Sequence, residues 1–428
     1  MTGNDLSGTE EKAGRTKGRR CVICTECGLC PGVSPANRMK GIRVLTKDGF
    51  SRSAISLKND QNLRVIVADV GTTTIAMELC AEDGSTRDSY VKINPQVEFG
   101  RDVLSRIEAA RDPQILDKMQ DMVKSALAEG AERFLKCLKP EEKPFMVVAA
   151  NTTMSYLLMG WDPRELGQAP FLARHLDGAS FELPVGEKII SCHLLPGFSA
   201  FVGSDLYAGA LACGMATSKE LSLLVDLGTN GEILLGNHDG ILATATAAGP
   251  AFEGGANRGV FGADLVKYLA TLRREGLLDD TGLLAEPYFT RGVRIGNLVL
   301  TQETVRNLQV AKAAIMAGIQ VLLRRAGKGM EEVDRVILAG GFGYFLNPED
   351  ASEIGLLPAG LKEKAISGGN TALAGAKRSA ERLLQVEEGL EGAKATYKDF
   401  PDVKVINLAM EDDFQDLYMN SMEIKPMD

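Results

Sequence analysis

The chain has 428 residues, of which 45% are apolar and 25% charged, the composition of a globular protein large enough for two or three domains. Its net charge of −9, with no dense basic run beyond residues 17–20, argues against a nucleic-acid partner. No apolar run approaches the roughly 20 residues that span a bilayer, and the polar start lacks the apolar core of a signal peptide. We therefore expect a cytoplasmic protein with no membrane partner.

Four cysteines stand at uniform spacing near the start of the chain, at Cys21, Cys24, Cys27 and Cys30. In a reducing compartment such a cluster favours metal binding over a disulfide framework. Structural zinc sites usually separate two C-x-x-C pairs by a longer loop, and this sequence has none between them. The spacing instead resembles the C-x-x-C-x-x-C run of bacterial ferredoxins, and Pro31 follows the last cysteine. We predict that the four thiolates bind a [4Fe-4S] cluster, with zinc as the alternative.

Strands and helices alternate from residue 63 onward. Apolar strands are predicted over 63–71, 74–80, 144–151, 221–228, 232–237, 240–246 and 333–341. Helical periodicity covers 97–138, with a break near Pro113, and a short helix follows the strand that ends at Asn151. Further helices are predicted over 264–276, 303–326 and 371–384. This alternation predicts an α/β architecture.

A short motif occurs twice, each time at the end of an apolar strand. The first copy runs from Asp69 through Gly71, and the second runs from Asp226 through Gly228. Glycine allows the chain to turn back sharply, and the turn can present backbone N–H groups and threonine hydroxyls to a phosphate. The strand-end aspartate can hold Mg²⁺, usually through water. Two such turns in similar lobes would hold the phosphates of ATP from both sides.

A glycine-rich stretch, 340–343, follows a further buried strand and would allow the backbone to approach an adenosine closely. Each of these features by itself is common in ordinary turns. Both turns in order, followed by the glycine-rich strand end, predict a nucleotide-binding protein.

This arrangement resembles the actin, hexokinase and heat-shock-chaperone ATPase superfamily. Within it, residues 63–428 are similar to the ATP-dependent reductive activators of corrinoid proteins. The similarity is carried by the strings ADVGTTTIAMELC, NPQVEFGRDVLSRI, NTTMSYLLMGWDP, PGFSAFVGSDLYAG, DLGTNGEILLG, AAGPAFEGGANRG and LAGGFGYFLNPEDASEIGLLP. The resemblance implies a homodimer of two-lobed chains that reduces Co(II) corrinoid to Co(I).

The resemblance also assigns the nucleotide site by position. The implied binding residues are Asp69, Gly71, Thr72, Thr73 and Thr74 in the first turn; Gly228, Thr229, Asn230, Gly231 and Glu232 in the second; Gly340, Gly341, Phe342 and Gly343 in the adenosine loop; and Asn151, Gly249 and Pro250 near the expected cleft. For the carboxylate that orients the attacking water, we expect Asp226 or Asp205. An equally plain interpretation of Asp205 is the N-cap of a helix.

The expected organisation is a cysteine-rich segment over 1–40, a linker over 41–62, a first lobe over 63–215 and a second lobe over 216–428. Members of the resembled family carry a larger iron–sulfur domain at one end, so the electron route departs from the family pattern here. The expected partners are a corrinoid protein and a low-potential electron donor, and the expected cofactors are ATP, Mg²⁺ and the cluster. The rival functions are an activator of the 2-hydroxyacyl-CoA dehydratase type, a small-molecule kinase and an ATP-switched binding module, the last two with structural zinc.

Overall fold

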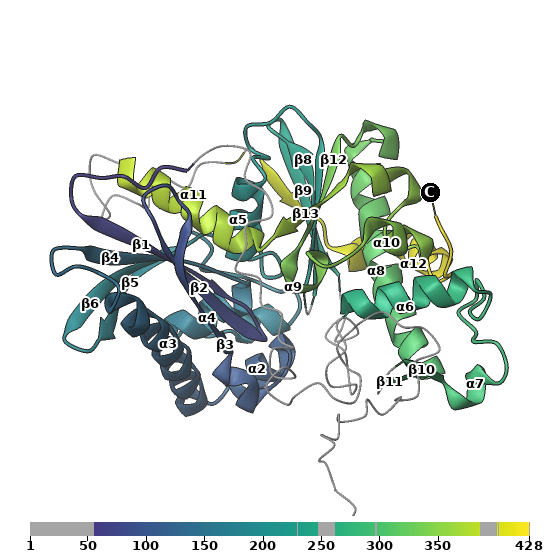
Figure 1. Cartoon of the computed structure of the whole chain (residues 1–428), viewed down its shortest axis with the longest axis horizontal. Coiled ribbons are helices and arrows are strands. Elements are labelled where there is room, and N and C mark those ends of the chain that lie inside the picture. The colour runs from purple at the N-terminus through teal and green to yellow at the C-terminus, as the bar shows by residue number, and fades with distance from the viewer. Residues whose placement is uncertain are drawn as a thin grey trace, which may run out of the picture.

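The structure is a computed structural model that describes residues 55–228, 230–246, 262–295, 298–385, 400 and 402–427. Two six-stranded mixed sheets stand side by side, each with helices packed against it (Figure 1). The predicted α/β class and the two-lobed architecture are thereby confirmed. No helix of the described residues is both long enough and apolar enough to cross a membrane.

The first sheet has the strand order β3-β2-β1-β4-β6-β5. Its first three strands form an antiparallel meander, while β1, β4 and β6 run parallel. β5 closes the far edge antiparallel to β6. The strands are β1 (Leu63–Val70), β2 (Thr74–Cys80), β3 (Thr86–Ile93), β4 (Lys143–Ala150), β5 (Ala179–Val185) and β6 (Lys188–Leu194).

The second sheet has the order β13-β12-β7-β8-β9-β14 and repeats this plan. Strands β7, β8 and β9 form an antiparallel meander, while β7, β12 and β13 run parallel. The match confirms the duplication that the repeated motif predicted. The strands are β7 (Ser222–Leu227), β8 (Gly231–Asn237), β9 (Gly240–Thr246), β12 (Arg335–Ala339), β13 (Ala365–Gly369) and β14 (Val403–Val405), with a separate hairpin of β10 (Val293–Ile295) and β11 (Leu298–Leu300).

The long helices begin and end where local sequence signals place them. Asp112 caps α3 and Pro113 occupies its first turn, while Thr301 caps α8 and Gly327 ends it in the left-handed conformation. The α-helices are α2 (Val103–Ala109), α3 (Pro113–Leu135), α4 (Thr152–Met159), α5 (Ser204–Ala212), α6 (Gly262–Arg274), α7 (Tyr288–Arg291), α8 (Gln302–Ala326), α9 (Gly340–Gly343), α10 (Pro348–Glu353), α11 (Thr371–Gln385) and α12 (Phe414–Asn420).

Strand β1 is buried on both of its faces, which explains its unbroken apolar sequence. Its side chains alternate between two cores, because successive residues of a strand point to opposite faces. Ile66 and Ala68 pack with α3 and α4, whereas Val65 and Val67 pack with α5 and α11. The strand end that carries Asp69 is therefore fixed from both sides.

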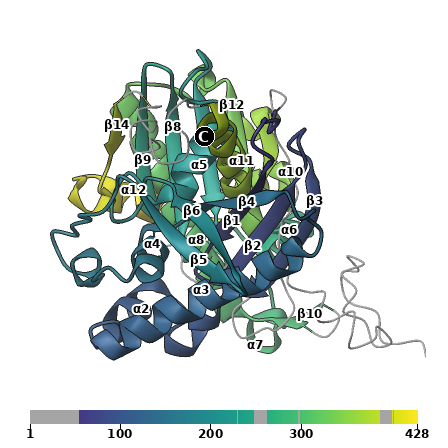
Figure 2. The same ribbon diagram turned by 90° about the vertical axis from the view of Figure 1, so that its left-hand side faces the viewer.

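Helix α5 lies between the two sheets and contacts both. Tyr207 and Leu211 pack against the first sheet, whereas Leu206 and Ala210 pack against the second. Helix α11 comes from the second half of the chain, yet it packs beside α5 on the first sheet (Figures 1 and 2). The two helices touch closely, because a Cβ at Gly375 would lie 1.8 Å from the backbone oxygen of Ala208. The connection between the lobes is thus built from both halves of the chain.

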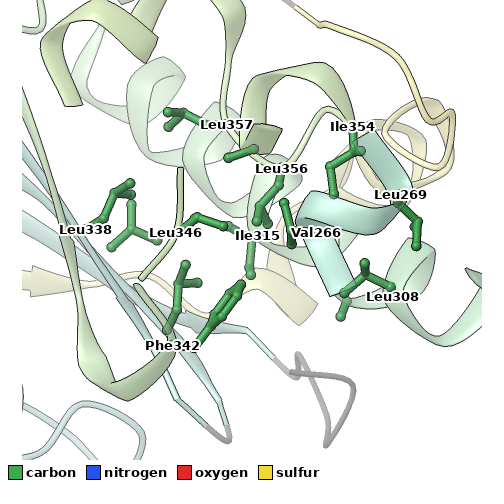
Figure 3. Packing of buried hydrophobic residues seen from close by; sticks show 14 of the residues in the cluster. Val266, Leu269, Leu308, Ile315, Leu338, Phe342, Leu346, Ile354, Leu356 and Leu357 are labelled. Carbon is green, nitrogen blue, oxygen red and sulfur yellow. The ribbon is translucent and has the colours of Figure 1, made fainter. Parts of the chain in front are cut away.

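The core of the second lobe gathers apolar side chains from α6, α8 and the residues around α10 (Figure 3). Phe342 belongs to this core and packs with Leu338 and Leu346. Residues 340–343, expected as a loop at the nucleotide, form the single helical turn α9. The phenyl ring of Phe342 therefore serves the core, and a role of this stretch at adenosine would rest on its backbone.

Candidate nucleotide site

The first turn connects β1 to β2 and is closed by a hydrogen bond from the backbone N–H of Gly71 to the oxygen of Thr74, at 2.9 Å. Asn94 supports the turn from outside: its side chain donates to the oxygen of Gly71 at 2.8 Å, and its backbone N–H donates to the oxygen of Thr73 at 2.9 Å. The carbonyls of the turn are thus held on one side.

Arg106 completes this support from a fully buried position in α2. Its guanidinium donates to the oxygen of Thr72 at 2.6 Å and to the oxygen of Gly100 at 2.9 Å. In a trans peptide the N–H points opposite to the carbonyl. The N–H groups that follow these held carbonyls therefore point away from Asn94 and Arg106, as an anion-binding turn requires. Asn94 and Arg106 both lie in the string NPQVEFGRDVLSRI, which carries the resemblance, but no role was predicted for either.

Asn151 lies directly after β4, beside the first turn. Its side chain donates to the hydroxyl of Thr72 at 3.0 Å and accepts from the N–H of Met154, so it also caps α4. Parallel pairing of β1 with β4 sets Asp69 opposite Ala149, which places Asn151 near the same sheet edge. The structure therefore places Asn151 beside the first turn.

The second turn connects β7 to β8 and is closed from the N–H of Gly228 to the oxygen of Asn230, at 3.0 Å. Asp226 and Glu232 face each other directly in the antiparallel register. Gly340 lies against Asp226: a Cβ there would be 2.4 Å from Asp226 Oδ1, and its φ of 82° favours glycine. Two of the three predicted elements, the second turn and the glycine-rich stretch, thus meet at one carboxylate.

Four carboxylates from the two lobes lie close enough to repel one another. Burial raises the pKa of Asp226 to about 8, and the negative charges of Asp205 and Asp69 add to the rise. Burial raises the pKa of Asp205 to about 7, with Asp69 adding to it, and raises that of Asp69 to about 6. The pKa of Glu232 is raised by burial and by Asp205 and Asp226. Such a cluster of acids is typical of a functional site.

Asp205 lies in the first turn of α5, and Gly203 is the N-cap of that helix. The alternative interpretation of Asp205 as the N-cap is therefore wrong by two positions. Gly203 allows the helix to start here, because a Cβ would lie 2.5 Å from the backbone nitrogen of Thr152. The close approach places Asp205 beside the end of β4, which brings it to Asp69.

Asn370 is a site residue that the sequence analysis missed. It follows β13 in the second half of the chain, and its side chain donates to Asp69 Oδ2 at 2.8 Å. The same side chain accepts from the N–H of Leu373 and so caps α11. This hydrogen bond lowers the pKa of Asp69 against the effect of burial. The signal in the sequence was an asparagine at the end of a strand and the start of a helix, the same context as Asn151.

Replacing Asn370 by alanine is expected to raise the KM for ATP about tenfold, because the buried Asp69 carboxylate loses a hydrogen bond and its orientation. Asn370→Asp is the matched variant, since aspartate also caps helices but repels Asp69. If the Asp69 contact matters, Asn370→Asp is impaired at least as strongly as Asn370→Ala. Wild-type ATP kinetics in Asn370→Asp would show that only the helix cap matters.

The carboxylates fit a Mg²⁺ ion that keeps several of its waters. Within the described residues, no three His, Cys, Asp or Glu side chains converge as a ready-made metal site. Mg²⁺ in nucleotide sites is usually bound by one or two carboxylates plus phosphate and water. Asp69 and Asp226 each end a strand next to a phosphate turn, so these two would hold the ion. The cation would also relieve the repulsion among the four acids.

Some predicted residues lie outside the described part of the chain. They are Cys21, Cys24, Cys27, Cys30, Thr229, Gly249 and Pro250. The iron–sulfur or zinc alternative and these nucleotide contacts stay predictions. Of the described residues, both turns, Asn151, Asp205, Glu232 and Gly340 gather around the same strand ends.

The two sheets share one strand arrangement, and the corresponding strands β1 and β7 each lead into an Asp-x-Gly turn. Together these features define an actin-like ATPase fold. A family model described as the RACo middle region matches residues 65–218, and one described as the C-terminal domain of RACo, the ASKHA domain, matches residues 220–260 and 256–428. A solved structure titled reductive activator for corrinoid, iron-sulfur protein is similar with a TM-score of 0.72 and 29% identity, over 86% of this chain and 67% of that one. The chain belongs to the RACo family.

Two named relatives show similarity in sequence. The corrinoid activation enzyme RamQ of Eubacterium limosum is 30% identical over 83% of this chain and 69% of the relative. A Methanosarcina barkeri protein named [Co(II) methylated amine-specific corrinoid protein] reductase is 25% identical, over 55% of this chain and 52% of its own length. The chain thus spans about two thirds of the first relative and half of the second.

Proposed function

We propose that this protein uses ATP to reactivate a corrinoid protein, reducing its inactive Co(II) corrinoid to Co(I). The observation that carries the proposal is the pair of phosphate turns with four clustered carboxylates between two lobes, in a chain whose relatives are named for corrinoid activation. The reaction needs one electron per cobalt and hydrolyses ATP to ADP and phosphate. We further propose that the protein acts as a cytoplasmic homodimer.

The residues of the two turns would bind and orient the nucleotide. Backbone N–H groups of the first turn would donate to phosphate oxygens, and the buried charge of Arg106 would favour the same anion from behind the turn. Asp69 and Asp226 would hold Mg²⁺ through water. Asp205 or Asp226 would accept a hydrogen bond from the attacking water and orient it towards the terminal phosphate.

Cys21, Cys24, Cys27 and Cys30 would hold the [4Fe-4S] cluster, which when bound supplies a single electron to the cobalt of the partner. An external low-potential donor would restore that electron. Cysteine thiolates are soft ligands suited to iron–sulfur clusters, and thiolate sulfur is also a common ligand of zinc. The metal content therefore decides between the redox function and its rivals.

The coupling between ATP and the electron would pass through the helices between the lobes. Asp69 belongs to the first lobe, while its partner Asn370 starts α11 and follows the second sheet. A nucleotide held by both turns would favour one arrangement of the lobes over another. ATP can drive the reduction only if those arrangements bind the partner differently.

The test is a visible spectrum of a corrinoid protein in the Co(II) state, recorded anaerobically with the full chain, a low-potential reductant and Mg-ATP. The methylated amine-specific corrinoid protein, the substrate named for one relative, is the first probe. We expect Co(I) to form with ATP and not without it. Phosphate transfer to a small molecule would favour the kinase function instead. Nucleotide-dependent binding of the corrinoid protein without formation of Co(I) would favour the binding module.

A further inference from the structure

A pocket of about 780 Å³ opens on the first lobe, lined by Arg111, by Tyr156 of α4 and by the segment that joins α4 to β5. Its wall is aromatic. The rings of Trp161 and His175 stack with centroids 4.3 Å apart, and Tyr156 meets each of them edge-on. None of these residues takes part in the nucleotide site described above.

Hydrogen bonds hold the segment around the pocket together. The hydroxyl of Tyr156 accepts from the backbone N–H groups of Arg174, at 2.6 Å, and His175, at 3.0 Å. The N–H of Leu172 donates to the oxygen of Glu165 at 3.0 Å. A surface fixed in advance loses little conformational entropy when a partner binds.

Three large apolar side chains are exposed beside this pocket. Phe171, Leu172 and Phe201 have exposed fractions of 36%, 45% and 43%, and the two phenyl rings touch with centroids 5.1 Å apart. Phe171 is held with a positive φ of 58°, which is rare for a bulky residue. We call the pocket and these three residues the docking face. Exposed aromatic residues next to Trp, Tyr and Arg are the composition of a protein interface centre.

The three arginines of the docking face are all paired with carboxylates. Arg111, Arg164 and Arg174 line the pocket together with Asp162 and Glu165. Arg164 pairs with Asp162, Arg174 with Glu165, and Arg111 with Glu108. The face is therefore close to neutral, and its exposed apolar side chains are what it offers to a partner.

One loop connects the docking face with the nucleotide site. Phe201 precedes Gly203 and Asp205, and its backbone N–H donates to the hydroxyl of Ser199 at 3.1 Å. The hydroxyl of Thr152 donates to the oxygen of Ser199 at 2.6 Å, and Thr152 follows Asn151, which contacts the first phosphate turn. A partner that contacts Phe201 would therefore contact the loop that leads into α5.

We propose that the docking face binds the corrinoid protein, a proposal that rests on the proposed function. The loop described above connects this face with the nucleotide site. A partner that is reactivated with ATP must respond to the bound nucleotide, whereas a permanent second copy of the chain has no such requirement. The exposed apolar group consists of three side chains, whereas permanent homodimer interfaces bury about 2,000 Å² or more and are strongly apolar. The face has the size of a transient contact.

The test compares the double variant Phe171→Ala/Phe201→Ala with the matched control Phe289→Ala. Phe289 is 44% exposed and lies on α7 in the second lobe. The probe is a corrinoid protein that the wild-type chain reduces. We expect the double variant to raise the KM for that protein about tenfold or more, with kcat at saturation and partner-independent ATP hydrolysis unchanged.

Three results would overturn the proposal. If the double variant has the wild-type KM for the corrinoid protein, that protein binds elsewhere on the chain, and the proposed function is unaffected. A double variant that loses self-association in sedimentation, with its KM unchanged, identifies the face as a contact between copies of the chain. If the wild-type chain reduces no corrinoid protein, the proposed function fails and the docking proposal fails with it. Melting temperature verifies that each variant is folded.

Discussion

Asp226→Asn is expected to lower ATP hydrolysis by ~100- to 10,000-fold and to abolish ATP-dependent cobalt reduction. The substitution keeps the shape of the side chain, but it removes the charge that would hold Mg²⁺ and orient water. The iron–sulfur spectrum should be unchanged, because the predicted cluster ligands lie far away in the sequence. Asp239→Asn, an exposed aspartate in the β8–β9 turn, is the matched control and should retain full activity. Retained hydrolysis in Asp226→Asn would contradict the assignment of the second phosphate turn.

The same substitution is expected to stabilise the nucleotide-free protein at high pH. The pKa of Asp226 is raised from 3.8 to about 8 in the folded state, chiefly by burial. Between these values the folded carboxyl keeps a proton that the unfolded chain releases, so stability falls as pH rises through this window. Asparagine has no proton to lose. Without Mg²⁺ and ATP, Asp226→Asn should therefore be about 1–3 kcal/mol more stable than wild type at pH 8, and similar to it near pH 4.

Thermal melts at both pH values, with and without Mg-ATP, measure this effect. An equal melting temperature for the two proteins at pH 8 would mean that burial and the neighbouring charges do not raise the pKa of Asp226 in the free protein. Asp205→Asn, examined alongside, decides which carboxylate orients the water. The variant with the lower kcat at saturating ATP and Mg²⁺ identifies it.

Cys24→Ser is expected to lose the cluster and all cobalt reduction while keeping nucleotide affinity within about twofold of wild type. Serine is a poor iron ligand, because the soft thiolate is replaced by a hard hydroxyl. The measurement combines iron, sulfide and zinc content on anaerobically purified protein with an EPR spectrum after reduction. About four irons and four sulfides per wild-type chain would match a [4Fe-4S] cluster.

Cys137→Ser is the matched control, because Cys137 is a partly exposed free thiol on the first lobe. Its iron content should equal that of wild type. Unchanged iron in Cys24→Ser would count against the ligand assignment, and zinc without iron in the wild-type chain would contradict the electron-transfer mechanism altogether.

The strand ends could be predicted from the sequence because their signals are local. The apolar run before Asp69 and the repeated run before Asp226 each specify a buried strand and a glycine turn. Predicted helices at 264–276 and 303–326 match α6 and α8 within two residues at each end, since their apolar periodicity is strong. The edge strand β5 and its neighbour β6 were missed, because each is short and mixes polar with apolar residues.

The residues that hold the site in place from a distance in sequence could not be predicted from local patterns. Arg106 is fully buried under the first turn, and a single arginine in a helix normally indicates a solvent-exposed face. Asn370 contacts Asp69 across 301 positions of sequence, a distance over which no spacing rule operates. Phe342 was assigned to the nucleotide by its place among glycines, whereas its ring packs into the core.

By itself, then, the sequence determined the two-lobed fold and the two Asp-x-Gly turns, because turns and apolar periods are properties of neighbouring residues. Ligand spacing is equally local, and from it the sequence predicts the chemistry of the cysteine cluster. Only the tertiary structure decided which acids share one site and raise each other's pKa. That outcome depends on the order of strands in two sheets and on the packing of α5 and α11 between strands far apart in sequence. Charge repulsion and burial act through space, so residues that no motif connects become one site.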